Sequence, residues 1–397
     1  MENHVFPYYN SYDGDNLEIV TPPDLKDGER IHYCIFQDES CIHVNDQSMY
    51  IWQEEGIQPL RSKDRGRISH CSDFVYEQGG RLYLTPDEIV EQMKLPTEPS
   101  APQPNIIFEF KHPEGCAVFI FDCSSAHESY AEDALMAHKM NKTPGGQQPK
   151  MHNTIIPSGL HQGEVQTMVF ADDSSERDKN GVSLAGKPKG MERILAERGL
   201  LETLVQGRRG KYVSVCTECK KSQEARDRAA KEAKARSDEI EGSGLPSLVD
   251  RSECQETADD LDRPINCCMR RLLAVQPDFA SEKPLLQLLI EKAGHKCLFL
   301  PKFHCELNPI EMVWGQAKRY FREESDGTFP TAKILVPQCL DRVSTTNIRR
   351  YFQHCYRYMD AYRDGLSVKE AEKAVKKFSS HRCIPKNADV SVRNEAK

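Results

Sequence analysis

The sequence predicts an α/β protein in which strands come first, a long insertion follows, and helices complete the chain. Short apolar runs with strand character, separated by turn residues, fill the region from about residue 31 to residue 121. A densely charged, alanine-rich segment from Lys220 to about Asp262 then interrupts the pattern. Amphipathic helical spacing dominates from residue 267 onward.

The composition fits a soluble globular protein with some polar loops. Hydrophobic residues make up 38% of the 397 residues and charged residues 29%. No stretch approaches the roughly 20 apolar residues that span a bilayer, and the N-terminus does not resemble a secretory signal. Fifteen cysteines in such a chain indicate a reducing compartment. The net charge of −8 differs from that of a compact DNA-binding module, although a local basic face can coexist with it.

The first half of the chain is predicted to hold several strands. Residues 1–30 are polar and rich in turn formers, and we expect an irregular lead-in there. IHYCIFQDES, from Ile31, predicts a strand, and residues 66–85 predict two more strands joined by a Gly-Gly turn. TPDEIVEQM predicts a helix capped by Thr85, and the segment PTEPSAPQPN before the next strand predicts a loop.

The remaining elements follow from apolar runs and helical spacing. GCAVFIFDCSSAH predicts a buried central strand that ends at Asp122. ESYAEDALMAHKMN has helical spacing, and GMERILAERGLL predicts a short helix that closes at Gly199. HKCLFLPKF predicts a further strand. Helices are predicted at CCMRRLLAVQPDF, PLLQLLIEKAGH, LNPIEMVWGQAKRYFREE, STTNIRRYFQHCYRYMDAYRDG and SVKEAEKAVKKF.

Three acidic residues stand at the ends of such elements. Asp38 and Asp122 follow the apolar runs of two strands, and Glu311 lies near the start of a helix. Strand ends and helix starts can converge on one edge of a sheet, where three carboxylates would need divalent cations to stay ionised together. Hard oxygen ligands suit Mg²⁺ or Mn²⁺, and two such ions can activate a water or a 3′-hydroxyl for phosphoryl transfer.

The sequence segments around these acids resemble a known family. FQDES with the downstream Trp52, FDCSSAH and LNPIEMVW resemble, in that order, the three blocks of the mariner-like DDE transposases. The resemblance runs from about Ile31 to at least Phe321. Longer sequence segments such as PKFHCELNPIEMVWGQAKRYFRE are similar to transposase-derived proteins of fungal genomes. It implies a ribonuclease-H-like mixed sheet flanked by helices, with a large helical and cysteine-containing insertion before the last acid.

The resemblance also assigns roles to single residues. It implies that Asp38, Asp122 and Glu311 are the catalytic acids, with the two aspartates bridging two Mg²⁺ or Mn²⁺ ions. His127 falls on a histidine that commonly follows the second acid, and a substrate-orienting and a structural role both stay open. Asn308 and Trp314 flank the third acid, and we expect Trp314 to serve helix packing.

Two features depart from the family pattern. Cys123 stands where many relatives have Asn after the second acid, which removes one polar contact. The separation from Asp122 to Glu311 is 189 residues (311 minus 122), against a few tens in compact mariner-like enzymes. The insertion must therefore fold out of the way of the third acid.

Cysteines in the insertion have the spacing of metal ligands. Cys216 and Cys219 form a CxxC, and Cys267 with Cys268 form a vicinal pair. Four thiolates would make a tetrahedral structural zinc site that ties together the ends of the charged segment, with Cys254 as a substitute for one vicinal ligand. Buried free thiols and a disulfide stay open as alternatives. The neighbouring pair His304 and Cys305 is expected to shape the loop before the third acid.

Double-stranded DNA, as transposon ends and target, is the partner that the resemblance implies; it leaves a homodimer open, and no membrane partner is expected. Mariner-like enzymes usually carry helix-turn-helix modules before the first acid, and some thirty residues cannot hold one. Phosphate contacts are expected from exposed cations. The candidates are Arg270, Arg271, Lys302, Lys318, Arg319, Arg322, Arg349, Arg350, Lys376 and Lys377.

The expected function is that of a nuclear DDE transposase core, which nicks DNA with water and then joins a 3′-hydroxyl to target DNA. Two alternatives stay open, namely a transposase-derived DNA-binding protein without catalysis and another ribonuclease-H-like nuclease that acts on branched DNA. The expected organisation is a lead-in at 1–30, the first part of the core at 31–150, the insertion at 151–295, the end of the core at 296–325 and a C-terminal helical region with a basic tail at 326–397.

Overall fold

The structure is a computed structural model that divides the chain into two compact units. The first unit comprises Met1–Cys123 and Leu289–Lys397, and the second comprises Ser124–Leu288. Each unit has its own core and is described by itself. The structure describes residues 4–46, 64–92, 104–124, 127–205, 211–222, 224, 228, 264–302, 304–378 and 384.

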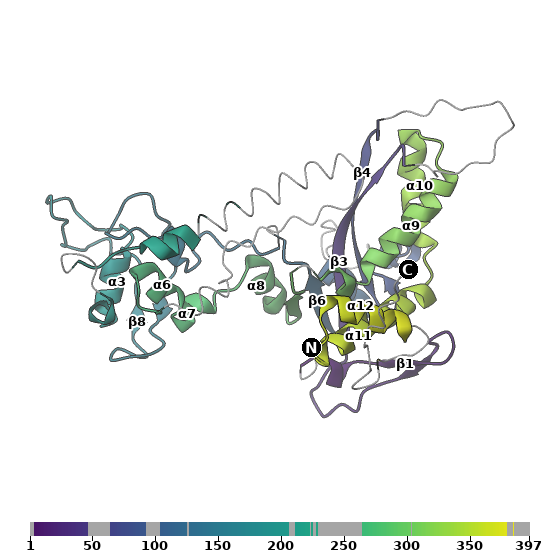
Figure 1. Ribbon diagram of the computed structural model, residues 1–397, viewed down its shortest axis with the longest axis horizontal. Helices are drawn as coiled ribbons and strands as arrows, with labels where there is room; N and C mark the ends of the chain where they lie inside the picture. Colours follow the sequence, from purple (N-terminus) through teal and green to yellow (C-terminus); the bar gives the residue numbers. More distant parts are fainter. Residues whose placement is uncertain are drawn as a thin grey trace, which may run out of the picture. The chain divides into compact units, whose positions relative to one another are not determined.

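A five-stranded mixed sheet forms the centre of the first unit, in the order β5-β4-β3-β6-β9. Strand β3 (His32–His43) pairs antiparallel with β4 (Ile68–Tyr76), which pairs antiparallel with β5 (Gly80–Arg81). On its other side β3 pairs in parallel with β6 (Cys116–Phe121), which pairs in parallel with β9 (Lys296–Phe299). The sheet is flanked by helices, which confirms the α/β prediction (Figure 1).

Burial explains why these segments form strands. All six residues of β6 are buried, as expected for a central strand covered on both faces. Residues alternate between the two faces, so Phe36 of β3 and its neighbour Ile120 of β6 lie on the same face. Phe36 meets the ring of Phe352 edge-on, with 5.3 Å between ring centroids. This pair anchors the helices of the C-terminal region to the sheet.

Helices α9 (Ile310–Glu324), α10 (Phe329–Asp341) and α11 (Thr345–Arg363) cover that face, and α12 (Val368–Lys377) packs on α11. The apolar side chains of α9, α10 and α11 share one core with the sheet. The buried residues of α9 recur at the spacing of an amphipathic helix. They are Ile310, Val313, Trp314, Ala317 and Phe321.

The opposite face contacts α2 (Pro104–Lys111), whose buried Phe108 lies 5.4 Å from the ring of Tyr33 between centroids. Helix α1 (Pro86–Gln92) begins as predicted at Thr85. The Glu88 backbone N–H donates to Thr85 Oγ1 at 3.3 Å, and the Thr85 N–H donates to the Glu88 carboxylate at 2.7 Å. These two bonds satisfy orphan donors at the helix start.

The expectation of an irregular lead-in is wrong for part of residues 1–30. A short 3-10 helix η1 (Phe6–Tyr8) is followed by a hairpin of β1 (Ser11–Asp13) and β2 (Ile19–Thr21). Gly14 adopts a φ of 89° in the connecting turn, which glycine tolerates without steric cost. The polar composition reflects the exposure of this hairpin rather than a lack of structure.

The second unit is a compact body of short elements around its own apolar cluster. Helices α3 (Met191–Glu197), α6 (Met269–Ala274) and α7 (Pro277–Ala280) surround this cluster. The boundary between the two units falls within α8 (Leu285–Lys292). The hairpin of β7 (Thr154–Ile155) and β8 (Val165–Gln166) and the 3-10 helices η2 (Ala137–Lys139) and η3 (Leu201–Thr203) complete it.

Three expectations for this region differ from the structure. The segment from 128 to 141, expected as a helix, contains only η2, because its apolar residues are buried in an irregular path within the second core. For the same reason the second unit begins at Ser124, earlier than the expected insertion boundary at 151. In addition, CCMRRLLAVQPDF forms two helices, because Pro277 begins a new helix after Gln276.

Within the described residues, no helix combines the length and the apolar character needed to cross a bilayer.

Candidate functional site

Asp38 and Asp122 are carried by neighbouring parallel strands. Phe36 of β3 and Ile120 of β6 are partners in the register. Asp38 lies two residues beyond the first and Asp122 two residues beyond the second, immediately after β6 ends. Because side chains alternate, both carboxylates lie on the face that α9 covers. The structure therefore brings these two expected site residues together.

Glu311 reaches the same place from the first turn of α9. The loop before α9 is fastened to β3 by Asn308, whose buried side chain donates from Nδ2 to the carbonyl oxygen of Gln37 at 3.4 Å. The side-chain oxygen of Asn308 accepts from the Ile310 N–H at 3.4 Å. This loop thus places the start of α9, and with it Glu311, beside the aspartates.

The electrostatics show that the three carboxylates act on one another. Burial, with the charges of Glu311 and Asp122 added, raises the pKa of Asp38 to about 7. Burial also raises the pKa of Glu311, with Asp122 adding to the rise and Lys318 opposing it. Carboxylates gathered in this way hold excess negative charge, which a divalent cation would neutralise. Oxygen donors of this kind fit Mg²⁺ or Mn²⁺.

Cys123, the departure from the family pattern, makes a polar contact of its own. Its thiol donates to the carbonyl oxygen of Leu300 at 2.9 Å, and the Leu300 N–H donates to the carbonyl oxygen of Phe121 at 2.8 Å. These bonds hold the ends of β6 and β9 together directly beside Asp122. Cys123 therefore supports the position of the second acid through the backbone.

Trp314 lies in the core, as expected, with 2% of its surface exposed. Its indole Nε1 is buried without a hydrogen-bond partner of good geometry, yet its proximity lowers the pKa of Asp38. The indole N–H thus faces the acid cluster from the packed side of α9. Trp314 therefore both packs in the core and stabilises the charged form of Asp38.

Sequence reasoning missed a fourth acid on the same face. Asp73 of β4 is the direct register partner of Asp38. Arg81 donates from Nε to Asp73 at 2.5 Å and also pairs with Asp341 of α10. Arg81 therefore offsets the charge of Asp73 and links the sheet to α10. The apolar alternation around it in SHCSDFVY was the only available signal that it faces inward.

His127 lies in the second unit, where its Nδ1 and the Ser124 hydroxyl are 3.0 Å apart. Both roles considered for it remain predictions. His304, in the loop before α9, lies 2.6 Å from Glu306 through Nδ1, and Tyr362 of α11 donates to the same carboxylate at 2.5 Å. Glu306 thus ties the loop to the end of α11. Trp52 lies outside the described residues.

The raised pKa of Asp38 predicts a pH dependence of stability. The folded chain keeps this proton up to about pH 7, while the unfolded chain releases it near the ordinary value of 3.8. The free energy of unfolding contributed by this group therefore falls as pH rises between these values, and the penalty is complete above about pH 7. Added Mn²⁺ should remove the penalty at high pH, so it should raise the melting temperature more at about pH 8 than at about pH 5.

Asp38→Asn separates this effect from other buried acids. Burial also raises the pKa of Glu77 to about 7. Glu77 therefore still contributes to the pH dependence of stability in the Asp38→Asn variant. The melting temperature of Asp38→Asn should change less between about pH 5 and about pH 8 than that of the unaltered protein. An identical slope in both proteins would contradict the assignment of the titration to Asp38.

The four expected cysteines gather in the second unit. The sulfur atoms of Cys216, Cys219, Cys267 and Cys268 all lie within 4.8 Å of one another. Cys267 Sγ is 3.6 Å from the sulfurs of Cys216 and Cys219. These separations exceed the roughly 2 Å of a disulfide, so the thiols are free. The cluster could hold a metal such as zinc; Cys254 lies outside the described residues.

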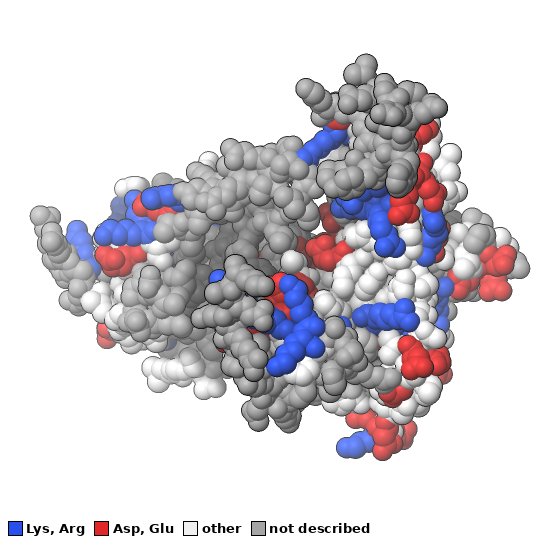
Figure 2. Space-filling model, turned by 45° about the vertical axis from the view of Figure 1, so that its right-hand side comes forward, with Lys and Arg blue, Asp and Glu red and all other residues white. Residues whose placement is uncertain are grey.

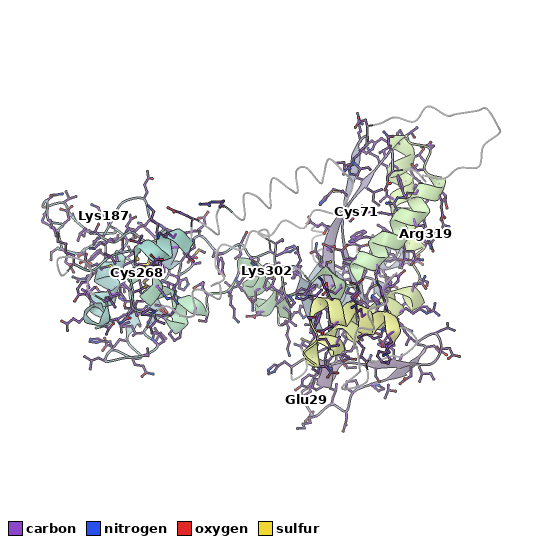
Figure 3. All side chains as sticks on the ribbon, in the orientation of Figure 1. Glu29, Cys71, Lys187, Cys268, Lys302 and Arg319 are labelled. Atoms are coloured by element: carbon purple, nitrogen blue, oxygen red, sulfur yellow. The ribbon has the colours of Figure 1, made fainter. Side chains whose placement is uncertain are left out.

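Three further cysteines are buried in the strands of the first unit. Cys34, Cys116 and Cys297 are free and buried in β3, β6 and β9. Figure 3 labels Cys268 within the second unit and Arg319 on α9 in the first.

Several expected DNA-contacting cations have structural partners instead. Arg349 donates to the backbone oxygens of Leu17, Glu77 and Gln78, and its neighbour Arg350 donates to Asn16. Arg271 is buried. On the face drawn in Figure 2, Lys and Arg side chains form separate groups with Asp and Glu groups between them. Arg319 and Lys318 on α9 lie nearest in sequence to the acid cluster.

No family model, curated protein or solved structure matches this chain.

Proposed function

We propose that the first unit is the catalytic core of a DDE-type transposase, which cuts DNA and joins a 3′-hydroxyl to target DNA with the help of Mg²⁺ or Mn²⁺. The observation that carries the proposal is the convergence of Asp38, Asp122 and Glu311 on one sheet face, where each charge affects the next. Burying three carboxylates together costs free energy unless a bound cation neutralises them, so a cluster of this kind favours a metal-dependent nuclease.

The fold supports the same reading. A three-stranded antiparallel meander is followed by two strands parallel to its first strand, and helices cover both faces. This arrangement agrees with the ribonuclease-H-like fold that the family resemblance implies. The large second unit is inserted in the chain between the second acid and the third, and the chain rejoins the sheet at β9.

The residues of the chain have distinct roles in the proposed reaction. Asp38 and Asp122 would bridge two divalent ions and Glu311 would complete the shell of one. Bound ions would supply charge neutralisation and would lower the pKa of a reacting water or hydroxyl. Asn308 fixes the start of α9, Cys123 holds the end of β6, and Trp314 presents its N–H to Asp38. These contacts preorganise the acids.

We further propose that Cys216, Cys219, Cys267 and Cys268 bind one structural zinc ion. The second unit has short elements and modest regular structure, so a metal that joins residue 216 to residue 267 would stabilise it. Double-stranded DNA as partner, a homodimer and nuclear localisation are parts of the same proposal and come from the family resemblance.

Metal titration against several DNA substrates tests the function. The full chain should cleave linear duplex DNA only when Mg²⁺ or Mn²⁺ is added, and it should join a 3′-hydroxyl end to a second duplex. Hairpin, nicked and branched DNA are assayed in parallel with the linear duplex. Cleavage of branched DNA alone would favour the resolvase-like alternative, and binding without cleavage at any divalent concentration would contradict a catalytic role.

A further inference from the structure

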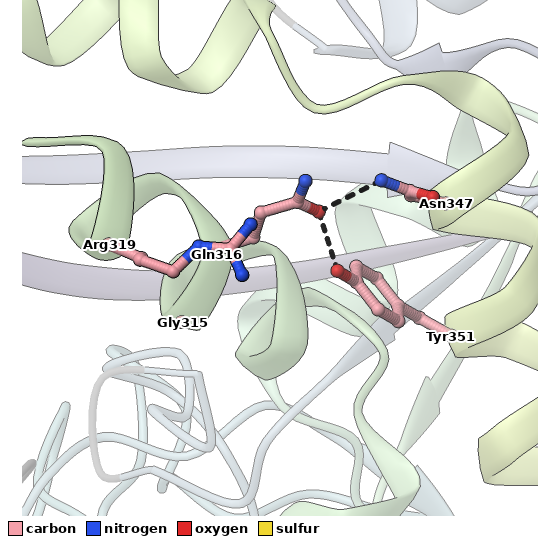
Figure 4. A pocket seen from close by; sticks show the side chains of 5 residues that line it. All are labelled: Gly315, Gln316, Arg319, Asn347 and Tyr351. Atoms are coloured by element: carbon pink, nitrogen blue, oxygen red, sulfur yellow. Dashed lines mark hydrogen bonds between the residues drawn. The ribbon is translucent and has the colours of Figure 1, made fainter.

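A cavity of about 320 Å³ lies between α9 and α11 in the first unit. Its lining comprises Gly315, Gln316 and Arg319 of α9 with Asn347 and Tyr351 of α11. Figure 4 shows Gln316 reaching from α9 to both of the α11 side chains. The cavity is therefore bounded by polar groups of two helices that belong to one core.

Gly315 has no structural reason to be glycine. It lies inside a helix, where glycine is the poorest residue apart from proline. Its φ is not positive, and a Cβ atom at this position would meet nothing within 4 Å. The missing side chain instead leaves the helix backbone open to the cavity. Close approach of a ligand to a backbone is a known use of glycine.

The hydrogen bonds of the cavity wall hold its shape. Gln316 accepts at Oε1 from the Tyr351 hydroxyl at 2.5 Å and from Asn347 Nδ2 at 3.3 Å. It donates from Nε2 to the hydroxyl of Tyr320 at 2.5 Å. Gln316 is thereby occupied, while the oxygen of the Asn347 amide and the ring of Tyr351 remain at the cavity.

Arg319 brings a positive charge to the cavity without a counter-charge. Its guanidinium lies over the ring of Tyr320 at 5.3 Å from the centroid. In the described part of the chain no carboxylate pairs with it, whereas nearby Arg322 and Arg342 pair with Asp46 and Glu324. An exposed guanidinium that no described carboxylate neutralises favours an oxyanion such as phosphate.

The α9 residues of the cavity follow Glu311 by one to two helical turns. Gly315 is four residues after Glu311 and Arg319 four residues after Gly315, so the three lie on one side of the helix. Each interval of four residues spans about 6 Å along the helix axis. This distance is comparable to the spacing of neighbouring phosphates in an extended DNA strand. The volume of the cavity is at the lower end of the range of small-molecule pockets, about 300 to 1,000 Å³. A cavity of this volume is too small to hold a DNA duplex.

We propose that this cavity holds one unpaired nucleotide of the DNA strand whose neighbouring phosphodiester lies at the acid cluster. Arg319 binds the phosphate, the backbone at Gly315 allows close approach, and the base packs against Tyr351. Stacking on an aromatic ring tolerates any base, so the site recognises an unpaired nucleotide rather than a sequence. The inference rests on the proposed nuclease function, because the acid cluster defines the position of the strand.

The test compares the binding of tailed and blunt DNA by the full chain. Fluorescent duplexes with a 3′ or a 5′ oligo-dT tail and a blunt duplex are titrated in Ca²⁺, which supports binding without cleavage. The protein should bind at least one tailed duplex roughly tenfold more tightly than the blunt duplex. Free thymidine monophosphate at the same concentration should not displace the tail; tighter binding of the free nucleotide would overturn the strand proposal.

Variants of the cavity provide the decisive comparison. Arg319→Gln and Gly315→Leu should remove the preference for the tail, and Gly315→Ala should weaken it while raising the melting temperature by roughly 2 to 4 °C. Arg363→Gln is the charge-matched control, because Arg363 lies at the end of α11 and pairs with Asp360 at 2.7 Å. Melting temperatures close to that of the unaltered protein show that the variants fold.

The outcomes separate this proposal from the proposed function. Equal affinity for tailed and blunt DNA, or the same loss in Arg319→Gln and Arg363→Gln, would overturn the nucleotide site even if the protein cleaves DNA. A tail preference that Arg319→Gln abolishes would support the site even if no metal-dependent cleavage is found, in which case only the nuclease proposal fails.

Discussion

Asp122→Asn is expected to lower Mn²⁺-dependent DNA cleavage by at least about a thousandfold. Neutralising one bridging carboxylate removes several kcal/mol of transition-state stabilisation, and each 1.4 kcal/mol is about a tenfold change in rate. Asp122 ends the central strand β6 and acts electrostatically on both other acids. The measurement is the initial rate of nicking of a labelled duplex over a range of Mn²⁺ concentrations.

Glu39→Gln is the matched control for this loss. Glu39 follows Asp38 on β3 but points to the opposite face, where it forms an exposed pair with His70 at 3.3 Å. Its replacement should leave cleavage near that of the unaltered protein, since exposed pairs contribute little. Asp122→Asn should melt at the same or a higher temperature without metal, because one repelling charge is gone. Retained cleavage in Asp122→Asn would sink the assignment of the acids.

Removal of zinc is expected to unfold the second unit. Structural zinc binding contributes on the order of 10 kcal/mol to small domains, far more than the packing of short helices leaves in reserve. The purified chain should contain one zinc ion, measured by elemental mass spectrometry. A strong chelator should then expose residues 124–288 to hydrogen exchange, while the sheet of the first unit stays protected.

Cys219→Ser should reproduce the effect of the chelator, because it removes one of four ligands. Cys41→Ser is the control, since Cys41 is an exposed cysteine on β3, outside the cluster. Only the first variant should lose zinc and the protection of the second unit. A second unit that stays protected without bound metal would show that the four thiols are simply packed together.

Local sequence patterns were sufficient to predict most strands and helices of the first unit. The strands at β3, β6 and β9 and the helices at α9, α11 and α12 are all predicted, because their apolar spacing is also their burial pattern. The pairing of β3 with β6 was out of reach of local reasoning. It depends on contacts such as Phe36 with Ile120, which lie far apart in sequence.

Local patterns failed where tertiary burial decided the conformation. The apolar residues of 128–141 are spaced like a helix, but they are buried in the second core along an irregular path that contains only η2. In the candidate site, the three acids followed from their positions at element ends and from the family resemblance. The contacts that hold them, Asn308 to Gln37 and Cys123 to Leu300, join distant segments and have no signature in the sequence.

The central claim is that Asp38, Asp122 and Glu311 share a pair of divalent ions. Crystals of the protein soaked in Mn²⁺ test it through anomalous diffraction at a wavelength that distinguishes manganese from zinc. We expect two manganese peaks roughly 4 Å apart, each within ligand distance of carboxylate oxygens from these residues. Ordered density for all three side chains with no manganese between them would contradict the account.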